Sequence, residues 1–152
     1  MIPRILSQAM KLPILLVTLL LSASSAVADD LVYLKCTGTI QWGEIKPSGE
    51  KSQETEEITL HFKIDTKEKF YIDSNNPENQ HEVKIWNGLV FEQFTDFKEP
   101  ATGIMNSQIA YDPPGKMISK TTLRDNNTSV EYTHEVSGIC EASDAASYEA
   151  SK

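Results

Sequence analysis

The stretch Leu31–Ile40, LVYLKCTGTI, decides the fold class of this 152-residue chain. Every second residue is apolar or small, so one face of an extended chain carries Val32, Leu34, Cys36, Gly38 and Ile40. A strand with one buried and one solvated face has this period of two, because successive side chains point to opposite sides. The stretch therefore predicts a half-buried β-strand with its cysteine on the buried face.

Two later stretches repeat the alternation. Residues 58–65 (ITLHFKID) place four apolar side chains on one face, and residues 130–140 (VEYTHEVSGIC) place Tyr132, Val136 and Cys140 together. The second stretch also places His134 on its apolar face. Both cysteines of the chain are therefore expected on the buried sides of their strands.

Turn signals separate further short strands. The Asn-Gly pair at 87–88 lies between two apolar runs and favours a type I′ hairpin turn, because this turn needs positive φ at both central residues. The sequence DPPG at 112–115 indicates a longer hairpin loop, and residues 73–80 and 124–129 form two more breaks. About eight strands are expected, over residues 31–40, 57–65, 68–73, 82–86, 89–95, 104–111, 116–123 and 129–140.

The other segments are expected outside the sheet. Residues 41–57 are polar and contain two glycines and a proline, which indicates a long loop, and residues 143–152 are expected to form a disordered tail. Sequential hairpins predict an all-β domain over residues 29–142, a small antiparallel up-and-down barrel of lipocalin-like type. A β-sandwich is the alternative.

The first 28 residues have the layout of a secretory signal peptide. Two basic residues, Arg4 and Lys11, precede an apolar run, and small residues lead to an expected cleavage site after Ala28. The apolar run is shorter than the roughly 20 residues that span a bilayer, so no stable membrane insertion is expected. The predicted location is therefore the periplasm or the outside of the cell.

Loss of the two basic residues with the leader takes the formal net charge from −8 to −10. This charge argues against a nucleic-acid partner, since phosphates require a basic face. The negative net charge either keeps the protein soluble or attracts a basic partner protein.

The two cysteines are expected to form one structural disulfide, Cys36–Cys140, because free thiols are uncommon in exported proteins. The bond would close a loop of about a hundred residues and stabilise the fold by up to roughly 4.7 kcal/mol. It would also require the first and last strands to be close neighbours, since the two Cα atoms must lie within about 7 Å. Gly38 and Gly138, each two residues from a cysteine, would allow a close approach of the two backbones.

Three short motifs carry a resemblance to known proteins. They are KCTGT at 35–39, I-x-Y-D-x-x-G over 109–115 and GICE at 138–141. With them the chain resembles small exported bacterial β-barrel proteins that have one cysteine near each end. In size and export it is also similar to the periplasmic lysozyme inhibitors, which are eight-stranded barrels. No inhibitory motif matches residue by residue, so no inhibitory residue is transferred to this chain.

No catalytic constellation is visible in the sequence. It contains no nucleophile elbow, no phosphate-binding glycine loop and no metal-binding motif, so no cofactor or metal is expected, and an enzyme is the least favoured class. His61 and His81 are expected to be solvated. His134 is expected to point inward, either as a hydrogen-bonded core residue or as a ligand contact.

The hairpin around residues 87–88 is apolar on both faces. A two-residue turn places Trp86 opposite Leu89 and leaves Phe91 on the same face, while Val90 lies on the other. The aromatic face is either covered by the long loop, exposed for binding, or turned inward to line a pocket. The candidate binding patch therefore comprises Trp86, Leu89, Phe91 and His134.

Three functions remain open at this point. The first is a monomeric binding or inhibitory module that uses its acidic surface against a basic protein. The second is a lipocalin-like carrier, which requires a cavity lined by aromatic residues for a small apolar ligand. The third is an enzyme, which requires titratable groups within hydrogen-bonding reach in a cleft.

Overall fold

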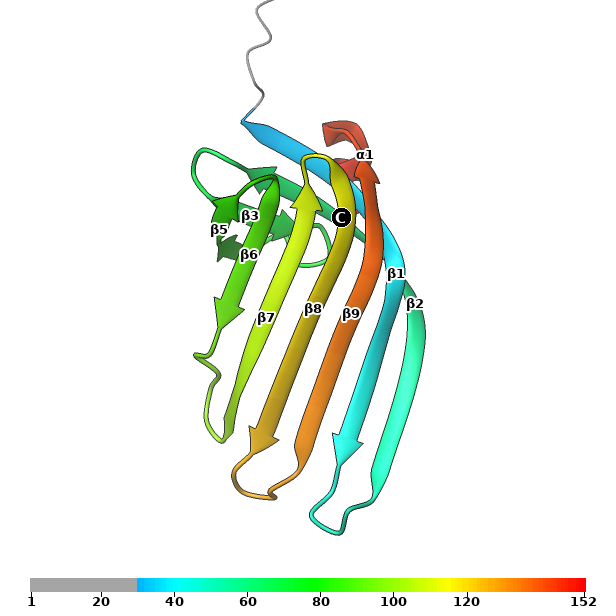
Figure 1. Cartoon of the computed structure of the whole chain (residues 1–152), viewed down its shortest axis with the longest axis vertical. Helices are drawn as coiled ribbons and strands as arrows, with labels where there is room; N and C mark the ends of the chain where they lie inside the picture. Colours follow the sequence, from blue (N-terminus) through cyan, green and yellow to red (C-terminus); the bar gives the residue numbers. More distant parts are fainter. Residues whose placement is uncertain (1–29) are drawn as a thin grey trace, which may run out of the picture.

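The computed structural model describes residues 30–152, and nearly all of them lie in one antiparallel β-sheet (Figure 1). The predicted leader and its cleavage site lie outside the described residues. No helix among residues 30–152 has the length and apolarity to cross a membrane. The elements are β1 (Leu31–Ile45), β2 (Lys51–Asp65), β3 (Phe70–Asp73), β4 (Gln80–Glu82), β5 (Lys84–Trp86), β6 (Leu89–Phe94), β7 (Ala101–Tyr111), β8 (Pro114–Asp125), β9 (Glu131–Ala142) and α1 (Ala145–Ala150).

The strand order confirms the predicted all-β, up-and-down architecture. Across the sheet the order is β4-β3-β2-β1-β9-β8-β7-β6-β5, so neighbours in space are neighbours in sequence except where β1 meets β9. Short hairpins make most of these connections, as the Asn-Gly turn predicted, but the longer loop predicted at 112–115 is only the two residues Asp112 and Pro113 between β7 and β8. The pairing of β1 with β9 joins the two ends of the meander into a nearly closed, barrel-shaped sheet.

The ring of strands is completed by one short segment, Gln80–Trp86. Its first part, β4, pairs with β3, and its last part, β5, pairs with β6, with Val83 between them. The backbone N–H of Val83 donates to the carbonyl oxygen of Lys69 (3.0 Å), which holds this crossing point against the β2–β3 turn. The single strand predicted at 82–86 is therefore two strands, because the chain changes partners at Val83.

The hydrophobic core lies on one face of this curved sheet, which we call the inner face. The alternating positions predicted for the first strand, for residues 58–65 and for the last strand all contribute to it, as expected from a period of two. Its fully buried side chains include Leu34, Ile64, Val90 and Ile109. The core occupies only the part of the barrel where β3–β6 complete the ring.

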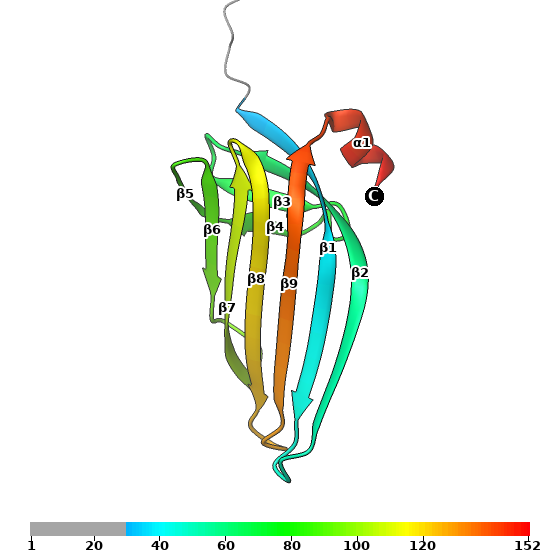
Figure 2. The same ribbon diagram turned by 45° about the vertical axis from the view of Figure 1, so that its right-hand side comes forward.

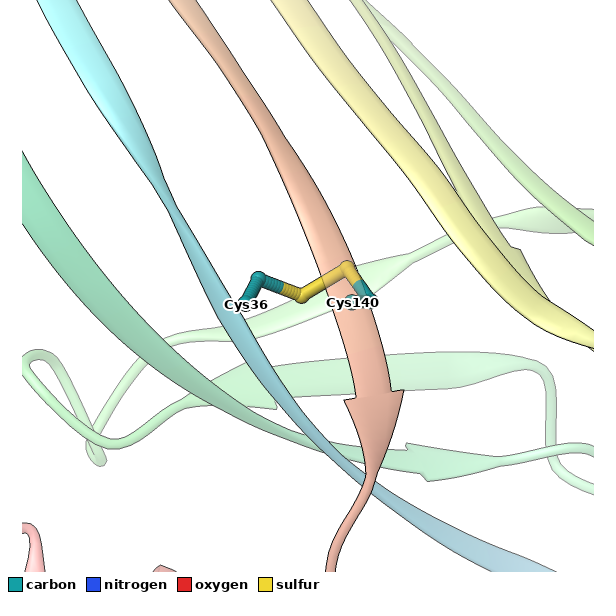
Figure 3. The surroundings of a disulfide bond; sticks show 2 residues. All are labelled: Cys36 and Cys140. Atoms are coloured by element: carbon teal, nitrogen blue, oxygen red, sulfur yellow. A yellow bond between two sulfur atoms is a disulfide. The ribbon is translucent and has the colours of Figure 1, made fainter.

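The disulfide joins β1 to β9 across directly opposed positions (Figure 3). Cys36 and Cys140 are both buried and their Cα atoms lie 3.9 Å apart, which confirms the predicted pairing. Gly38 and Gly138 oppose each other one inner-face position further along the same two strands. A Cβ at Gly138 would lie 2.6 Å from the carbonyl oxygen of Thr37, so the close backbone approach requires glycine there.

The segment predicted as a long loop, residues 41–57, is instead the extension of two strands. β1 and β2 are each 15 residues long and remain paired from Leu31↔Asp65 to Ile45↔Lys51. The alternation used to find strands fails here, because the strand ends project beyond the core and both faces are wet. In Figure 1 the same extension is seen in β7, β8 and β9, whose ends reach well below β3–β6.

The residues after Ala142 form helix α1 rather than the disordered tail expected from their composition. Asp144 caps the helix by accepting a hydrogen bond from the backbone N–H of Ser147 (2.7 Å). Tyr148 is only 2% exposed and packs on Tyr33, with ring centroids 5.8 Å apart. A single buried aromatic side chain therefore anchors the end of the chain beside β1 and β2 (Figure 2).

Candidate functional site

The barrel has two halves that differ in what their inner faces carry. In the closed half, β3–β6 complete the ring around the core. The open half is formed by residues 41–57, 101–106 and 120–135, which belong to the ends of β1, β2, β7, β8 and β9. The inner face of the open half is concave and uncovered, and it is the candidate functional site.

Two rows of directly opposed residues cross the inner face of the open half. Both rows mix aromatic and acidic side chains with small polar ones, whereas the inner positions of the closed half are mostly apolar and buried. The first row is Glu54, Trp42, His134, Thr121, Met105 and Phe94. The second row is Ser52, Glu44, Tyr132, Leu123 and Gly103.

A cleft of about 440 Å³ lies over these two rows. Trp42 and Tyr132 line it and are 47% and 42% exposed, although both point to the same side of the sheet as the core. Leu123 and the buried Thr121 form part of its floor. Large aromatic side chains left in solvent on a concave face are typical of a surface that binds another molecule.

Trp42 and His134 form the centre of the cleft. Their ring centroids are 4.0 Å apart with the planes tilted by 33°. Burial lowers the pKa of His134 below its usual value, so the neutral imidazole is favoured at neutral pH. Its Nε2 atom is buried without a hydrogen-bond partner among residues 30–152. The neutral ring therefore acts as an aromatic surface on which the indole of Trp42 rests.

Charge is divided between the two faces of the sheet. The register places every lysine and arginine of the nine strands on the outer face: Lys35, Lys51, Lys63, Lys84, Lys116, Lys120 and Arg124. The inner face of the open half carries Glu44, Glu54 and Glu56. Two outer-face acids are paired, in Lys120–Glu135 (3.1 Å) and Lys35–Glu141 (4.0 Å), whereas these three glutamates make no ion pair within the described part of the chain. The candidate site is therefore acidic and uncompensated.

A second polar cluster lies at the boundary between the two halves. Glu92 of β6 accepts a hydrogen bond from the hydroxyl of Tyr71 on β3 (2.6 Å) and one from Nδ1 of His81 on β4 (2.9 Å). The rings of Tyr71 and His81 are stacked, with centroids 4.7 Å apart and planes 2° from parallel. The side chain of Glu92 is 7% exposed. These contacts tie the two ends of the sheet together from the inside.

This cluster shifts the titration of its members. The hydrogen bond to Glu92 raises the pKa of His81, and burial raises the pKa of Tyr71 well above its usual value. In residues 30–152, no serine, threonine or cysteine side chain hydrogen-bonds to any of the three. The same residues contain no group of three His, Cys, Asp or Glu side chains arranged to hold a metal ion. The hydrogen bonds of the cluster therefore support the fold.

The predicted patch is divided between the two faces of the sheet. The register Trp86↔Leu89 places these two residues and Phe91 on one face, as the two-residue turn predicted; this is the outer face, and Trp86 is 71% exposed. Val90 fills the core, so the aromatic face does not turn inward to line a pocket. His134 lies on the inner face beside Trp42, so it does not join the other three.

Of the outer-face patch, Phe91 alone borders a shallow cleft of about 740 Å³. Phe91 and Ile118 contribute apolar surface to it, and Lys84 and Lys120 contribute positive charge. Its remaining lining includes several amide side chains of β6 and β7. This cleft is larger than the inner one but lies on the convex surface and has no concentration of aromatic side chains.

Comparisons of the chain with protein-family models, with curated proteins and with solved structures find no match. Function is therefore inferred from the site alone. The Cys36–Cys140 bond indicates a non-reducing compartment, such as the periplasm or the outside of the cell.

Several residues of the site were missed at the level of sequence. Trp42 and Glu44 continue the alternation of Val32–Ile40, and this continuation was the available signal. His81 was expected to be solvated, but it is half-buried and bound to Glu92. No pattern in a three-residue strand identifies such a partner, since Glu92 lies on the opposite end of the sheet.

Proposed function

We propose that this protein is an exported binding module that holds a basic partner protein against the inner face of its open half. The observation that carries the proposal is the uncompensated acidic and aromatic surface around Trp42, Tyr132 and Glu54. Lysine and arginine side chains match this surface, because they can place their charge beside a carboxylate and over an aromatic ring at once. Each such contact at an exposed ring contributes about 0.5–1 kcal/mol.

The net charge of the chain supports the same partner. An acidic protein accelerates its encounter with a basic one, and the gain falls with ionic strength. Export completes the proposal: the leader is cleaved after Ala28 and the mature, monomeric chain acts in the periplasm or outside the cell. An intact mass that lacks residues 1–28 after expression in the native host would support this step, and retention of the leader would contradict it.

A carrier of a small apolar ligand is the second candidate. The aromatic cleft favours it, and about 440 Å³ falls within the range of small-molecule sites. Against it, the interior of the closed half is filled by the core, and the cleft lies open on the concave face. Binding of an apolar ligand would depend little on salt, whereas binding of a basic protein would weaken strongly as salt is added.

The decisive experiment compares two triple variants that change net charge equally. E44Q/E54Q/E56Q removes three acidic side chains from the inner face, and E131Q/E135Q/E141Q removes three from the outer face of β9. Each mature variant, and the wild type, is used to capture proteins from the envelope fraction of the native host. We expect the wild type and the outer-face variant to retain basic proteins that the inner-face variant loses. These proteins should be released at about 1 M salt, where the Debye length is about 3 Å.

Two outcomes would overturn the proposal. Equal loss of the captured proteins in both triple variants would show that only bulk charge is at work. Retention by the inner variant of every captured protein would place the binding surface elsewhere, with the outer cleft around Phe91 as the next candidate.

A further inference from the structure

We propose that the partner binds by adding an extended basic segment as a new strand along the free edge of β2. This inference rests on the proposed function and names how the open half would hold its partner. The edge in question is Gln53–Thr59, on the side of β2 that faces away from β1. Strand addition of this kind gains affinity from main-chain hydrogen bonds and specificity from alternate side chains.

The register shows that this edge lacks a neighbour. β3 pairs with β2 only from Phe62 to Asp65, and after Asp73 the chain turns away. Residues 51–57 are all exposed, and within residues 30–152 no strand pairs with that side of them. The sheet therefore continues from β2 into β3 in the closed half and stops at β2 in the open half, as Figure 1 shows.

One hydrogen bond reveals which backbone groups point toward the free edge. The carbonyl oxygen of His61 accepts from the backbone N–H of Ser74 (2.9 Å), on the side away from β1. In an antiparallel strand, alternate residues direct both their N–H and their C=O to the same side. The odd-numbered residues therefore present unpaired main-chain groups to the edge: Gln53, Thr55, Glu57 and Thr59.

The charges along this edge select the partner. Glu54 and Glu56 lie on its inner side and Glu57 on its outer side. Pairing of this edge with a second copy of itself would bring two glutamate-rich segments together, whereas a basic segment brings opposite charges together, so the charges favour the basic segment as the occupant. A segment with a lysine or arginine at every second position would place those side chains beside Glu54 and Glu56 and toward Trp42.

The test uses a synthetic ten-residue peptide of alternating lysine and threonine and the mature chain. We expect NMR amide hydrogen exchange to slow on binding at Gln53, Thr55, Glu57 and Thr59. The amides of Glu54, Glu56 and Ile58 are already paired with β1 and should change little. Binding through side chains alone would not slow hydrogen exchange at every second amide of the edge.

A matched pair of variants removes a single edge donor. Thr55→Pro deletes an N–H that points to the free edge, a position where a strand tolerates proline, and Thr55→Val keeps the N–H and the shape of the side chain. We expect Thr55→Pro to weaken peptide binding about tenfold relative to Thr55→Val. The same peptide N-methylated at alternate residues, tested on the wild type, covers the case in which Thr55→Pro fails to fold.

The outcomes separate this inference from the proposed function. Equal affinity for the plain and the N-methylated peptide, or uniform protection along β2, would overturn strand addition. The proposed function would still stand if E54Q/E56Q weakened binding of both peptides. Absence of binding of either peptide at low ionic strength would overturn both.

Discussion

The same five long strands run through the closed and the open half of the barrel. Their inner face is apolar and buried in the closed half, and acidic and aromatic in the open half. In the closed half, the inner positions of β1 and β2 are Leu34, Cys36, Phe62 and Ile64, and all four are buried. Six residues further along each strand, roughly 20 Å at about 3.4 Å per residue, the inner positions are aromatic on β1 (Trp42) and acidic on β2 (Glu56). Alternation decides which way a side chain points, and the chemistry of the side chain decides what that face does.

The division has an energetic reason. Burial of aliphatic side chains and the disulfide stabilise the closed half, whereas the exposed aromatics of the open half bury little area in the free protein. The open half can therefore carry residues chosen for binding, because its strands are held in register by pairing that begins in the core. Substitutions in the two halves should consequently separate stability from binding.

The largest expected effect is the loss of the disulfide. Its sequence separation of 104 residues gives a stabilisation of about 4.7 kcal/mol in the chain-entropy model. The double variant C36A/C140A should therefore lose about 3–5 kcal/mol of unfolding free energy, measured by guanidinium denaturation. A loss below about 1 kcal/mol would mean that β1 and β9 are held by the ladder and the core alone.

The next effect compares one buried and one exposed inner-face residue. Ile64→Ala should cost about 2–5 kcal/mol of stability, because it leaves a cavity in the core. Trp42→Ala should change the unfolding free energy by less than about 1 kcal/mol, yet weaken binding of the lysine–threonine peptide. A large stability loss for Trp42→Ala would show that the open half is part of the core rather than a binding face.

These comparisons also show where the sequence was informative. The alternation in residues 31–40, 58–65 and 130–140 predicted the strands and the inward cysteines, and the count of two cysteines in a chain expected to be exported predicted their pairing. The Asn-Gly turn predicted the register Trp86↔Leu89, and Asn87 and Gly88 both have positive φ. Each of these predictions rests on neighbouring residues and on one physical cause, which is either the burial of one face of a strand or a positive φ that few residues adopt.

The sequence was uninformative where tertiary context decides. Residues 41–57 are mostly polar and only Trp42 extends the alternation of the first strand, so the ends of β1 and β2 are set by their register with the buried part of each strand. Helix α1 depends on the packing of Tyr148 against Tyr33, which lies more than a hundred residues earlier. The candidate site was overlooked for the same reason, since Trp42 and Glu54 lay in the predicted loop.

A smaller effect concerns the polar cluster at the boundary between the halves. Glu92→Gln leaves one buried donor, from Tyr71 or His81, without a carboxylate acceptor and should cost about 1–3 kcal/mol of unfolding free energy. Glu56→Gln is the matched control, because Glu56 is exposed on the same face and has no such partners. Equal effects of the two substitutions would show that the cluster does not hold the ends of the sheet together.

The smallest effect is a difference in pH dependence between two histidines, one in each half. His81 has a raised pKa because it is bound to Glu92, with Asp73 also nearby, so its contribution to stability is present below about pH 6.5 and is lost as pH rises through its folded pKa. His134 has a pKa lowered by burial against Trp42. Its contribution is therefore present above about pH 6.5 and lost as pH falls through its folded pKa.

The two histidines can be told apart by single substitutions. The stability lost in His81→Gln should be greater at acidic than at neutral pH, and that lost in His134→Gln should be greater at neutral than at acidic pH. Both differences should stay below about 1 kcal/mol, since solvent screens groups that are only half-buried. These differences in unfolding free energy are measured by urea denaturation of the wild type and the two variants at acidic and at neutral pH. If the stability losses of the two variants changed with pH in the same direction, His81 and His134 would lie in the same kind of environment. The contrast between a charged His81 bound to Glu92 and a neutral His134 packed against Trp42 would then be wrong.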